Sequence, residues 1–362
     1  MQRKGVSITV YSCYKVNESK IHKKVKEVKE VIYFDRFKFF NQIYAHFFWF
    51  FRNPCKYLRL LFFSLKRSNG IFKLYLKYLY EVILIERSNP EHIHAHYGCI
   101  ASDMSLLVHL LTGIPFTFTS HGVDIFFSPP QNYKIKTKLS KKHITISEYN
   151  KNYILTKFRV DENKLAVIHS GIDFSQNFPD PKNREENLII SVARLEHKKG
   201  IDNLIKACLR LKGKNINFQC LIVGEGTERL ILENLINDYD LTNEVKLLGF
   251  MTQDEVFELL SKARIKILPS RSETMGVALM EAIAMRVPVI GPNVLGVPEL
   301  IEDNVSGFLV NPDDVDTLAD KIRILLTNDK LRSSFSEIAY KKITIDFNLK
   351  IETDKLLSIW KE

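Results

Sequence analysis

Residues 265–290 read IKILPSRSETMGVALMEAIAMRVPVI. Two short runs rich in β-branched residues, Ile265–Leu268 and Val287–Ile290, flank Val277–Met285, whose apolar residues have helical spacing. A strand, a helix and a second strand in this order predict a βαβ unit with parallel strands. This unit decides the fold class, because the same alternation continues through most of the chain.

From residue 92 onward, short apolar runs alternate with helical patterns. The expected strands are His92–His96, Pro115–Thr119, Ile144–Ile146, Leu165–Ile168, Leu188–Ala193, Phe218–Val223, Val245–Leu248, Ile265–Leu268 and Val287–Ile290. The expected helices are Cys99–Leu111, Glu148–Lys157, Ile201–Leu211, Thr227–Tyr239, Asp254–Ala263, Val277–Met285, Asp313–Leu326 and the segment from Leu331 onward. This predicts an α/β protein with two doubly wound domains, whose ligands bind at the carboxyl ends of the strands.

The polar stretch from Pro179 to Asn187 is typical of a domain linker. We therefore expect an N-terminal domain at residues 1–180 and a C-terminal domain at 187–335. Residues 336–362 are expected to form a helical segment that packs back toward the N-terminal domain.

The composition, with 45% hydrophobic and 26% charged residues in 362, excludes a mainly disordered, collagen-like or multi-span membrane protein. Five scattered cysteines with no CxxC pair argue against a disulfide framework and a structural zinc site. The first residues lack the apolar core of a secretory signal, and no apolar run reaches the ~18 residues of a spanning helix. We therefore expect a cytoplasmic protein.

Charge and aromatic residues are concentrated at the start of the chain. Residues 1–90 carry a net charge of +12 and 20 of the 40 aromatic residues, whereas residues 181–362 carry a net charge of −3. Two interpretations remain open: the aromatic residues form a domain core, or the segment docks on an anionic membrane surface. No nucleic-acid-reading motif is present, so nucleic acid is not an expected partner. Locally, we expect a strand at Val6–Tyr11 and helices at Ile32–Phe51 and Lys56–Lys66.

The strongest chemical signal is the pair Glu273 and Glu281, which flank Gly276 at the start of the expected helix. Free N–H groups at a helix N-terminus favour an anion such as a diphosphate, and the two carboxylates could accept hydrogen bonds from sugar and ribose hydroxyls. The alternative is a helix-terminal charge and an ordinary surface glutamate, because so short a pattern often occurs by chance.

Arg194 and Lys199 directly follow the expected strand Leu188–Ala193. Two cations at a strand's carboxyl end can neutralise a departing phosphate, although a solvated basic turn is the simpler reading of this segment alone.

His121 follows another strand and has Asp124 close by in sequence. It could reach a ligand, or it could simply be satisfied within its loop.

Two further patterns are weak. His92, His94 and His96 share one strand face and could suggest zinc, but a motif this short is poorly specific. Gly224-Glu-Gly226 resembles part of a dinucleotide fingerprint, but Arg229 replaces the third glycine, so nicotinamide binding is not expected.

In their order, these motifs resemble the glycosyltransferase family 4 group of retaining, GT-B-fold enzymes. The stretches that carry the resemblance are HIHAHYG, FTFTSHGVDIF, TISEYNKNYI, VIHSGIDF, SVARLEHKKG, LIVGEGTER, LLGF, SETMGVALMEAIA, VPVIGPNVLGVPELI and GFLVNPDD, between about residues 90 and 330. Within the family, the first two look most like bacterial exopolysaccharide transferases of the colanic-acid type.

The resemblance implies two Rossmann-like domains that face a cleft, and a role for each matching residue. His121 would contact the donor sugar, Arg194 and Lys199 the diphosphate, Glu273 the sugar hydroxyls and Glu281 the ribose. The donor-binding loop would include Met275, Gly276 and Val277, and the backbone at Phe250 would meet the base. The family needs no metal cofactor.

One feature departs from the family pattern. Family members open with a strand, a glycine-rich or hydroxyl-containing loop and a helix, whereas Met1–Gly5 resembles the end of that helix and Val6–Tyr11 the second strand. We therefore expect the first βα unit to be missing, either because the start is misassigned or because the chain is truncated.

The resemblance implies a retaining enzyme of surface polysaccharide biosynthesis, such as capsule, exopolysaccharide or lipopolysaccharide. It would move a sugar from a nucleotide-diphosphate donor to a glycan or polyprenyl-linked acceptor, as a peripheral protein on the inner face of the cytoplasmic membrane. The alternative is a catalytically impaired GT-B relative that acts as a binding or scaffold protein.

Overall fold

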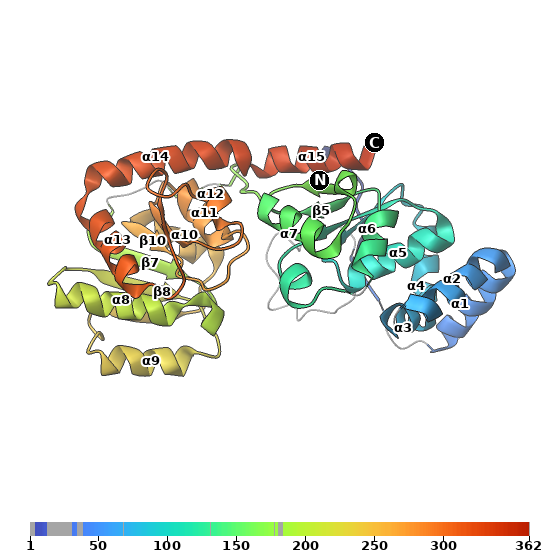
Figure 1. Ribbon diagram of the computed structural model, residues 1–362, viewed down its shortest axis with the longest axis horizontal. Coiled ribbons are helices and arrows are strands. Elements are labelled where there is room, and N and C mark those ends of the chain that lie inside the picture. Colours follow the sequence, from blue (N-terminus) through green and yellow to red (C-terminus); the bar gives the residue numbers. More distant parts are fainter. Residues whose placement is uncertain are drawn as a thin grey trace. The chain divides into compact units, whose positions relative to one another are not determined.

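The structure is a computed structural model that describes residues 4–12, 31–34, 39–67, 69–130, 132–176, 178–179 and 184–361. The chain divides into two compact units (Figure 1). Unit 1 comprises residues 1–146, 150–168 and 356–362, and unit 2 comprises residues 147–149 and 169–355. The main boundary thus falls at residues 168 and 169, ahead of the polar stretch at Pro179, and the last residues join unit 1.

Unit 1 is built on a parallel four-stranded sheet in the order β3-β4-β5-β6. Its strands are β3 (Ile93–His96), β4 (Phe116–Ser120), β5 (His143–Thr145) and β6 (Leu165–Val167). Its helices are α1 (Phe39–Arg52), α2 (Pro54–Arg67), α3 (Asn69–Lys77), α4 (Leu79–Arg87), α5 (Ile100–Thr112), α6 (Tyr133–Leu139) and α7 (Glu148–Phe158). One apolar core joins α1 to α5, with Trp49, Leu79 and Val108 almost fully buried.

The start of unit 1 differs from the sequence-based expectation. Strand β1 (Val10–Ser12) pairs in parallel with β2 (Val31–Tyr33) in a separate two-stranded sheet, so the strand expected at Val6–Tyr11 lies later. The helix expected from Ile32 is wrong at its N-terminal end, because Ile32 pairs with Tyr11 and α1 begins at Phe39. Val31 and Ile32 are β-branched and favour a strand once a partner is available. The expectation for Met1–Gly5 falls mostly on residues outside the described ranges.

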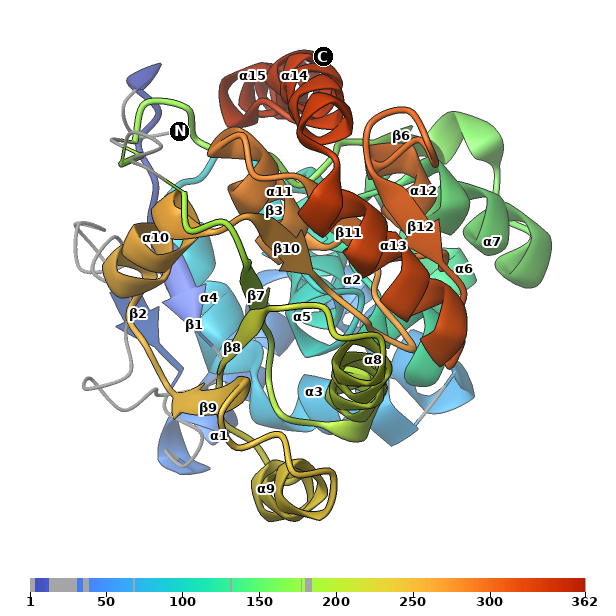
Figure 2. The same cartoon turned by 90° about the vertical axis from the view of Figure 1, so that its left-hand side faces the viewer.

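Unit 2 contains a parallel six-stranded sheet in the order β12-β11-β10-β7-β8-β9. The strands are β7 (Leu188–Val192), β8 (Gln219–Val223), β9 (Val245–Gly249), β10 (Ile265–Ile267), β11 (Val289–Pro292) and β12 (Phe308–Val310). Figure 2 shows β10, β7, β8 and β9 in succession, with α8 and α10 on opposite sides. The strand order reverses direction at β7 and β10, which is the switch point where ligands bind in such sheets.

The helices of unit 2 cover both faces of this sheet. They are α8 (Ile201–Gly213), α9 (Arg229–Asp238), α10 (Gln253–Lys262), α11 (Val277–Ala284), α12 (Val297–Leu300), α13 (Val315–Thr327) and α14 (Asp329–Asp346). The last helix, α15 (Leu349–Lys361), continues beyond the end of unit 2 at residue 355. A core of apolar side chains from α8, α9 and α13 packs on Ile189, Ile265 and Ile267. Every strand expected from residue 92 onward is present within a few residues, whereas β12 was not expected.

Two glycines let the loop after β7 approach the loops after its two neighbours, β10 and β8, closely. Gly200 has φ +63°, and a Cβ there would lie 2.1 Å from the Pro269 carbonyl oxygen. Gly224 has φ +140°, and a Cβ there would lie 1.9 Å from the Ala193 oxygen. Any side chain at either position would force these loops apart.

Candidate functional site

Two loops of unit 2 meet where the neighbouring strands β7 and β10 end. The first runs through the short 3₁₀ helix η6 (His197–Lys199), and the second from Pro269 to Gly276. The backbone N–H groups of Arg271 and Ser272 both donate to the Lys198 carbonyl, at 2.9 and 3.3 Å. The loops are therefore joined by main-chain hydrogen bonds, so side chains far apart in sequence are fixed side by side.

Lys199 and Glu273 form the main contact between these two loops. The Lys199 ammonium lies 2.6 Å from a Glu273 carboxylate oxygen, and both side chains are mostly buried, with 16% and 17% exposed. A charge-assisted hydrogen bond this short in partial burial is stronger than a surface ion pair. The structure thus brings together two of the residues singled out in the sequence, 74 positions apart.

Arg194 lies on the first loop but takes a different partner. Its guanidinium contacts the Glu196 carboxylate at 2.5 Å, and its side chain is 65% exposed. The other Glu196 oxygen pairs with Lys198 at 3.1 Å. Arg194 is thus held at the surface near Lys199, with a guanidinium that exchanges partners at little cost.

Arg271, which the sequence did not single out, holds both loops in place through its guanidinium. The Arg271 guanidinium donates to both carboxylate oxygens of Asp202 at 2.8 and 2.9 Å, and to Asp313 at 2.8 Å. It also donates to the His197 carbonyl at 2.7 Å. Although burial opposes it, hydrogen bonds from Arg271 and Lys206 lower the pKa of Asp202 to about 2. No local sequence pattern could have suggested this role, because Asp202 lies 69 positions away.

The second loop ends at the N-terminus of α11. Gly276 is the N-cap, with φ +74°, a conformation that glycine adopts without strain. Met275 before it is buried, whereas Val277 is half-exposed. Because the first N–H groups of a helix have no intrahelical acceptor, this end of α11 carries partial positive charge. It lies on the same loop as Glu273, so an anion bound here would also be near Lys199.

Glu281 and Phe250 lie further along the same unit. Glu281, inside α11, accepts a hydrogen bond from the Gln253 amide at 3.0 Å, and burial raises the pKa of its carboxyl. Phe250 follows β9 and is 79% exposed, the least covered of the predicted residues. The structure records no contact between Phe250 and the Lys199–Glu273 pair among the described residues.

The remaining predicted residue, His121, belongs to unit 1. Its ring stacks on His96, with 5.8 Å between centroids, and meets the Tyr97 ring at a tilt of 50°, with 4.8 Å between centroids. Its backbone N–H donates to Asp124 at 2.9 Å, and its carbonyl accepts from the Asn150 amide at 2.8 Å. Burial lowers the pKa of His121 although Asp124 opposes this, so the imidazole is neutral at pH 7.

The loop beside His121 rests on a buried ion pair that the sequence did not reveal. The Lys136 ammonium, fully buried, lies 2.8 Å from Asp103 and also donates to the Gly98 carbonyl. The Gly98 N–H donates in turn to Asp124 at 2.5 Å. Asp124 therefore joins the loops after β3 and β4 and holds His121 by its backbone.

His92, just before β3, and His94, within it, form hydrogen bonds with threonine side chains. Both ring nitrogens of His94 meet threonine hydroxyls, of Thr117 at 2.8 Å and Thr119 at 3.1 Å, and His92 also contacts Thr117. Within the described ranges, no three His, Cys, Asp or Glu side chains group as metal ligands would.

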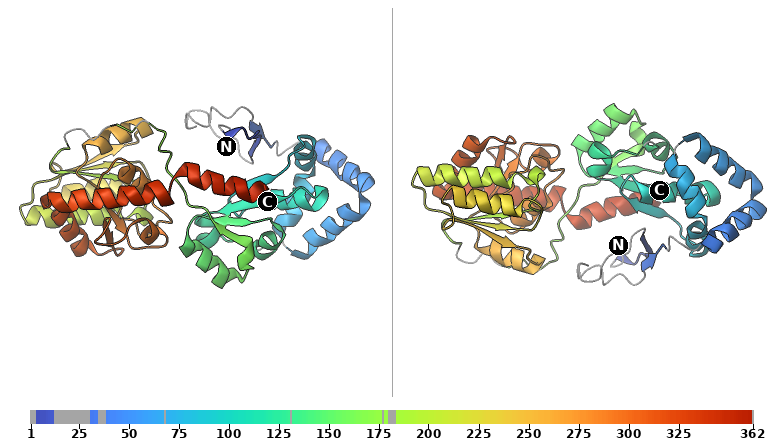
Figure 3. Two further views of the ribbon diagram at one scale, coloured as in Figure 1. Left: turned by 90° about the horizontal axis from the view of Figure 1, so that it is seen from above. Right: turned by 90° about the horizontal axis from the view of Figure 1, so that it is seen from below.

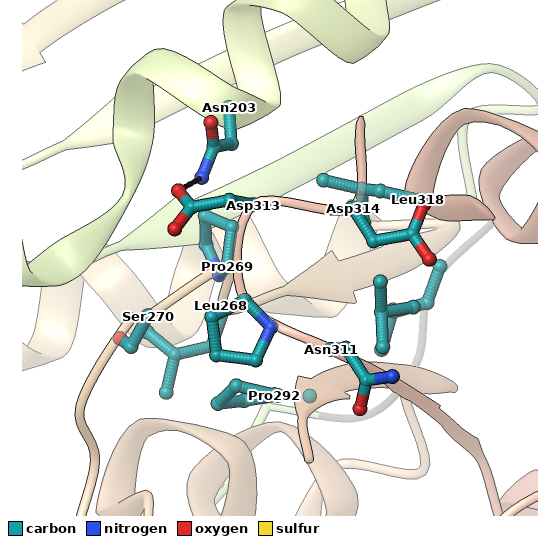
Figure 4. A pocket seen from close by; sticks show the side chains of 13 residues that line it. Asn203, Leu268, Pro269, Ser270, Pro292, Asn311, Asp313, Asp314 and Leu318 are labelled. Carbon is teal, nitrogen blue, oxygen red and sulfur yellow. Dashed lines mark hydrogen bonds between the residues drawn. The ribbon is translucent and has the colours of Figure 1, made fainter. Parts of the chain in front are cut away.

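A small pocket lies near the ends of β10, β11 and β12, lined by residues such as Asn203, Pro269 and Asp313 (Figure 4). It has room for about one water molecule. None of the predicted site residues lines it. We assign it no role in ligand binding, because a nucleotide sugar is far larger.

Comparisons with known families match both halves of the chain. Residues 1–176 match the model described as Glycosyltransferase Family 4, and residues 173–342 match Glycosyl transferases group 1.

Among curated proteins, an uncharacterized glycosyltransferase of Methanocaldococcus jannaschii is 29% identical over 75% of this chain and 76% of its own length. The putative colanic acid biosynthesis glycosyltransferase WcaL of Escherichia coli is 35% identical over 57% of this chain and 53% of its own. The amylovoran biosynthesis glycosyltransferase AmsK of Erwinia amylovora is 40% identical over 46% and 40%. The chain thus spans about half the length of these last two relatives.

Solved structures show the same fold. A glycosyltransferase from Rickettsia africae has a TM-score of 0.76 at 24% identity, over 99% of this chain and 91% of that one. Anabaena HepE, solved in complex with UDP, has a TM-score of 0.68 at 19% identity, over 79% and 83%. These structures show that the chain has the GT-B fold, and the two consecutive family models show a glycosyltransferase with a Glycosyltransferase Family 4 N-terminal half and a Glycosyl transferases group 1 C-terminal half.

Proposed function

We propose that this protein transfers a sugar, with retention of its anomeric configuration, from a nucleotide-diphosphate donor to a glycan or polyprenyl-linked acceptor. The observation that carries the proposal is the Lys199–Glu273 pair, placed between two strand ends beside the N-terminus of α11. The names of WcaL and AmsK favour surface polysaccharide biosynthesis as the setting.

The donor diphosphate binds the two loops of unit 2. Lys199, Arg194 and the N–H groups that open α11 supply positive charge for its oxygens. On binding, Lys199 exchanges part of its contact with Glu273 for a phosphate oxygen, which frees Glu273 to accept from a sugar hydroxyl. The exposed Arg194 leaves Glu196 for the diphosphate, an exchange that costs little at the surface.

The chemical step breaks the bond between the anomeric carbon and the phosphate oxygen and forms one to the acceptor oxygen on the same face. The leaving diphosphate takes the acceptor's proton, so no protein nucleophile is required. Arg194, Lys199 and the α11 N-terminus stabilise the charge that develops on the leaving group. Because these groups supply that charge, we propose no metal requirement and no other cofactor.

The remaining predicted residues bind other parts of the donor. Glu281 accepts hydrogen bonds from the ribose, and the backbone around Phe250 meets the base. Met275, Gly276 and Val277 shape the loop against the phosphates and sugar. His121, neutral at pH 7 and held by Asp124, contacts the donor sugar.

On the acceptor side we propose that unit 1 docks on an anionic membrane, at the inner face of the cytoplasmic membrane. Helices α1 and α2 follow each other at one end of unit 1 and meet at an angle, as the blue ribbons in Figure 3 show. They present an aromatic face of apolar side chains, each at least 39% exposed, made of Phe39, Phe40, Ile43, Tyr44, Phe47, Phe50, Phe51, Leu58, Phe62 and Leu65. Single exposed apolar residues need no explanation, but ten of them on two consecutive helices favour an interaction site.

Charge selects the partner for this face. Residues 39–67 contain five Lys and Arg and no Asp or Glu. Interfacial helices combine such cations with aromatic residues, and each cation near an anionic surface contributes about 1 kcal/mol. Within the described part of the chain, no helix is long and apolar enough to cross a bilayer. In the proposed contact, α1 and α2 lie in the membrane interface through their aromatic residues and cations, close to a polyprenyl-linked acceptor.

Incubation of the purified protein with a panel of nucleotide sugars and lipid-linked acceptors tests the proposed reaction. Turnover, measured as release of nucleoside diphosphate, supports it, and Glu273→Ala and Arg194→Ala should abolish it. Arg210→Ala is the matched control, because it breaks a comparable exposed pair between Arg210 of α8 and Asp316 of α13. Donor binding without turnover would favour the catalytically impaired binding protein instead, and absence of both would overturn the proposal.

A further inference from the structure

The interior strand β10 carries a lysine at position 266, although strands inside a parallel sheet are buried on both faces and usually carry apolar residues. Lys266 is 0% exposed, and its ammonium has no hydrogen-bond partner among the described residues. β10 lies inside the sheet, where Lys266 is paired in register with Ile190 of β7 and Val289 of β11. A buried amine without a partner costs several kcal/mol, so simple packing does not account for it.

The geometry of the sheet shows which way Lys266 faces. Its neighbours Ile265 and Ile267 belong to the core formed with α8 and α13. Because successive side chains of a strand alternate between faces, Lys266 points to the opposite face. Helix α11 packs against β10 and β11.

The charges that act on Lys266 come from two elements. Burial lowers the pKa of Lys266 to about 7, and Glu281 of α11 and Cys220 of β8 oppose this. Lys266 in turn opposes the rise that burial causes in the pKa of Glu281, whose other partner is the Gln253 amide. The charges of Lys266 and Glu281 thus act on each other between the sheet and α11, although no ion pair joins the two side chains among the described residues.

We propose that the buried Lys266 ammonium keeps the Glu281 carboxylate ionised, so that Glu281 can accept hydrogen bonds from the donor ribose. The inference rests on the proposed function, in which Glu281 binds the ribose. The Glu281 carboxyl is partly buried on a mostly apolar helix. Without a nearby cation it would therefore take up a proton more readily. A protonated carboxyl is a poorer acceptor for two hydroxyl groups than a carboxylate.

The test compares matched ribonucleotide and 2′-deoxyribonucleotide pairs, because only the ribose contact differs between them. The probes are UDP and dUDP, GDP and dGDP, and ADP and dADP, titrated by calorimetry against the full chain at pH 6 and pH 8.5. Wild type should prefer the ribonucleotide of the pair that binds by about tenfold or more, the expected value of a hydrogen bond to a charged group. Lys266→Met should lose much of this preference at pH 6 and regain it as the pH is raised toward 8.5, because a higher pH favours the ionised Glu281 carboxyl. Its affinity for the deoxyribonucleotide should stay that of wild type.

Lys266→Met has nearly the same volume and removes a buried charge, so we expect it to fold with equal or higher thermal stability. Lys266→Leu serves the same purpose should the methionine variant be unstable. A preference that survives at pH 6 in either variant would overturn the role of Lys266, as would equal loss of both nucleotides.

Glu281→Gln separates this inference from the proposed function. If Glu281→Gln loses the ribose preference while Lys266→Met keeps it, only the role of Lys266 is wrong. If Glu281→Gln retains the preference, the assignment of Glu281 to the ribose is wrong, and the inference falls with it.

Discussion

Replacement of Gly276 by alanine tests whether the start of α11 holds the donor phosphates. The residue has φ +74°, and the left-handed conformation costs a non-glycine residue roughly 1–2 kcal/mol. The new Cβ would lie 3.0 Å from Leu279 Cδ1, the end of a flexible side chain that can move, and 3.8 Å from Glu273 Cγ. Crowding therefore adds little to the conformational cost.

We expect Gly276→Ala to lower the free energy of unfolding by about 1–2 kcal/mol, or the melting temperature by roughly 2–8 °C. Donor affinity should fall more. Strain at the N-cap re-aims the first N–H groups of α11, and loss of one hydrogen bond to a charged phosphate corresponds to roughly tenfold or more in Kd.

Thermal unfolding and calorimetric titration with nucleoside diphosphates measure both effects. Gly213→Ala is the matched control, because it lies at the end of α8 with nothing within 4 Å of its new Cβ. It should leave affinity unchanged and stability equal or slightly higher. A Gly276→Ala protein with lower stability but wild-type affinity would refute the phosphate site at this helix.

Three further outcomes are expected. Replacement of Phe40, Phe47 and Phe51 together by serine should abolish flotation with phosphatidylglycerol vesicles, whereas Leu230→Ser with Ile231→Ser, at comparably exposed positions on α9, should not. Membrane docking would be contradicted if wild-type binding did not depend on salt, or if it were as strong to phosphatidylcholine vesicles as to phosphatidylglycerol vesicles. Arg271→Ala should weaken donor binding because it lets the two loops separate, and the added change Asp202→Ala should not restore the affinity. An unchanged nucleotide affinity in Arg271→Ala would show that the loops stay together without Arg271. Burial lowers the pKa of the fully buried His143 to about 3, below the value near 6.5 expected in the unfolded chain, so the free energy of unfolding should fall as the pH drops from 6.5 toward 3. In urea unfolding, His143→Gln should show a weaker pH dependence of this free energy over the same range, and an unchanged dependence would exclude His143 as its cause.

The alternation of strands and helices was enough to predict most of unit 2. Parallel strands end at the same edge of a sheet, so Lys199 and Glu273 could be expected to lie near each other before their 2.6 Å contact was known. The identity of the partners was not predictable. Arg194 pairs with Glu196, two residues away, and only the loop conformation decides this.

Other features depend on contacts that a linear pattern does not contain. Alternation in Ile265-Lys266-Ile267 suggests a lysine in solvent, but α11 covers that face of the sheet and buries it. Ile32 fits a helical spacing, yet β1 offers it a strand partner. The Arg271–Asp202 contact joins a loop to a helix 69 residues away, and no local motif marks it.

The most direct test of the central claim is the rate of nucleoside diphosphate release from the donor sugar by Lys199→Met and Glu273→Gln. Each variant removes one half of the pair without enlarging its side chain. We predict that each lowers kcat/KM by roughly 10²–10³, the usual loss when one group that stabilises transition-state charge is removed. We also predict that both together cost far less than the product of the two, because the groups act as one unit. Turnover at the wild-type rate in either single variant would contradict the claim that this pair holds the donor.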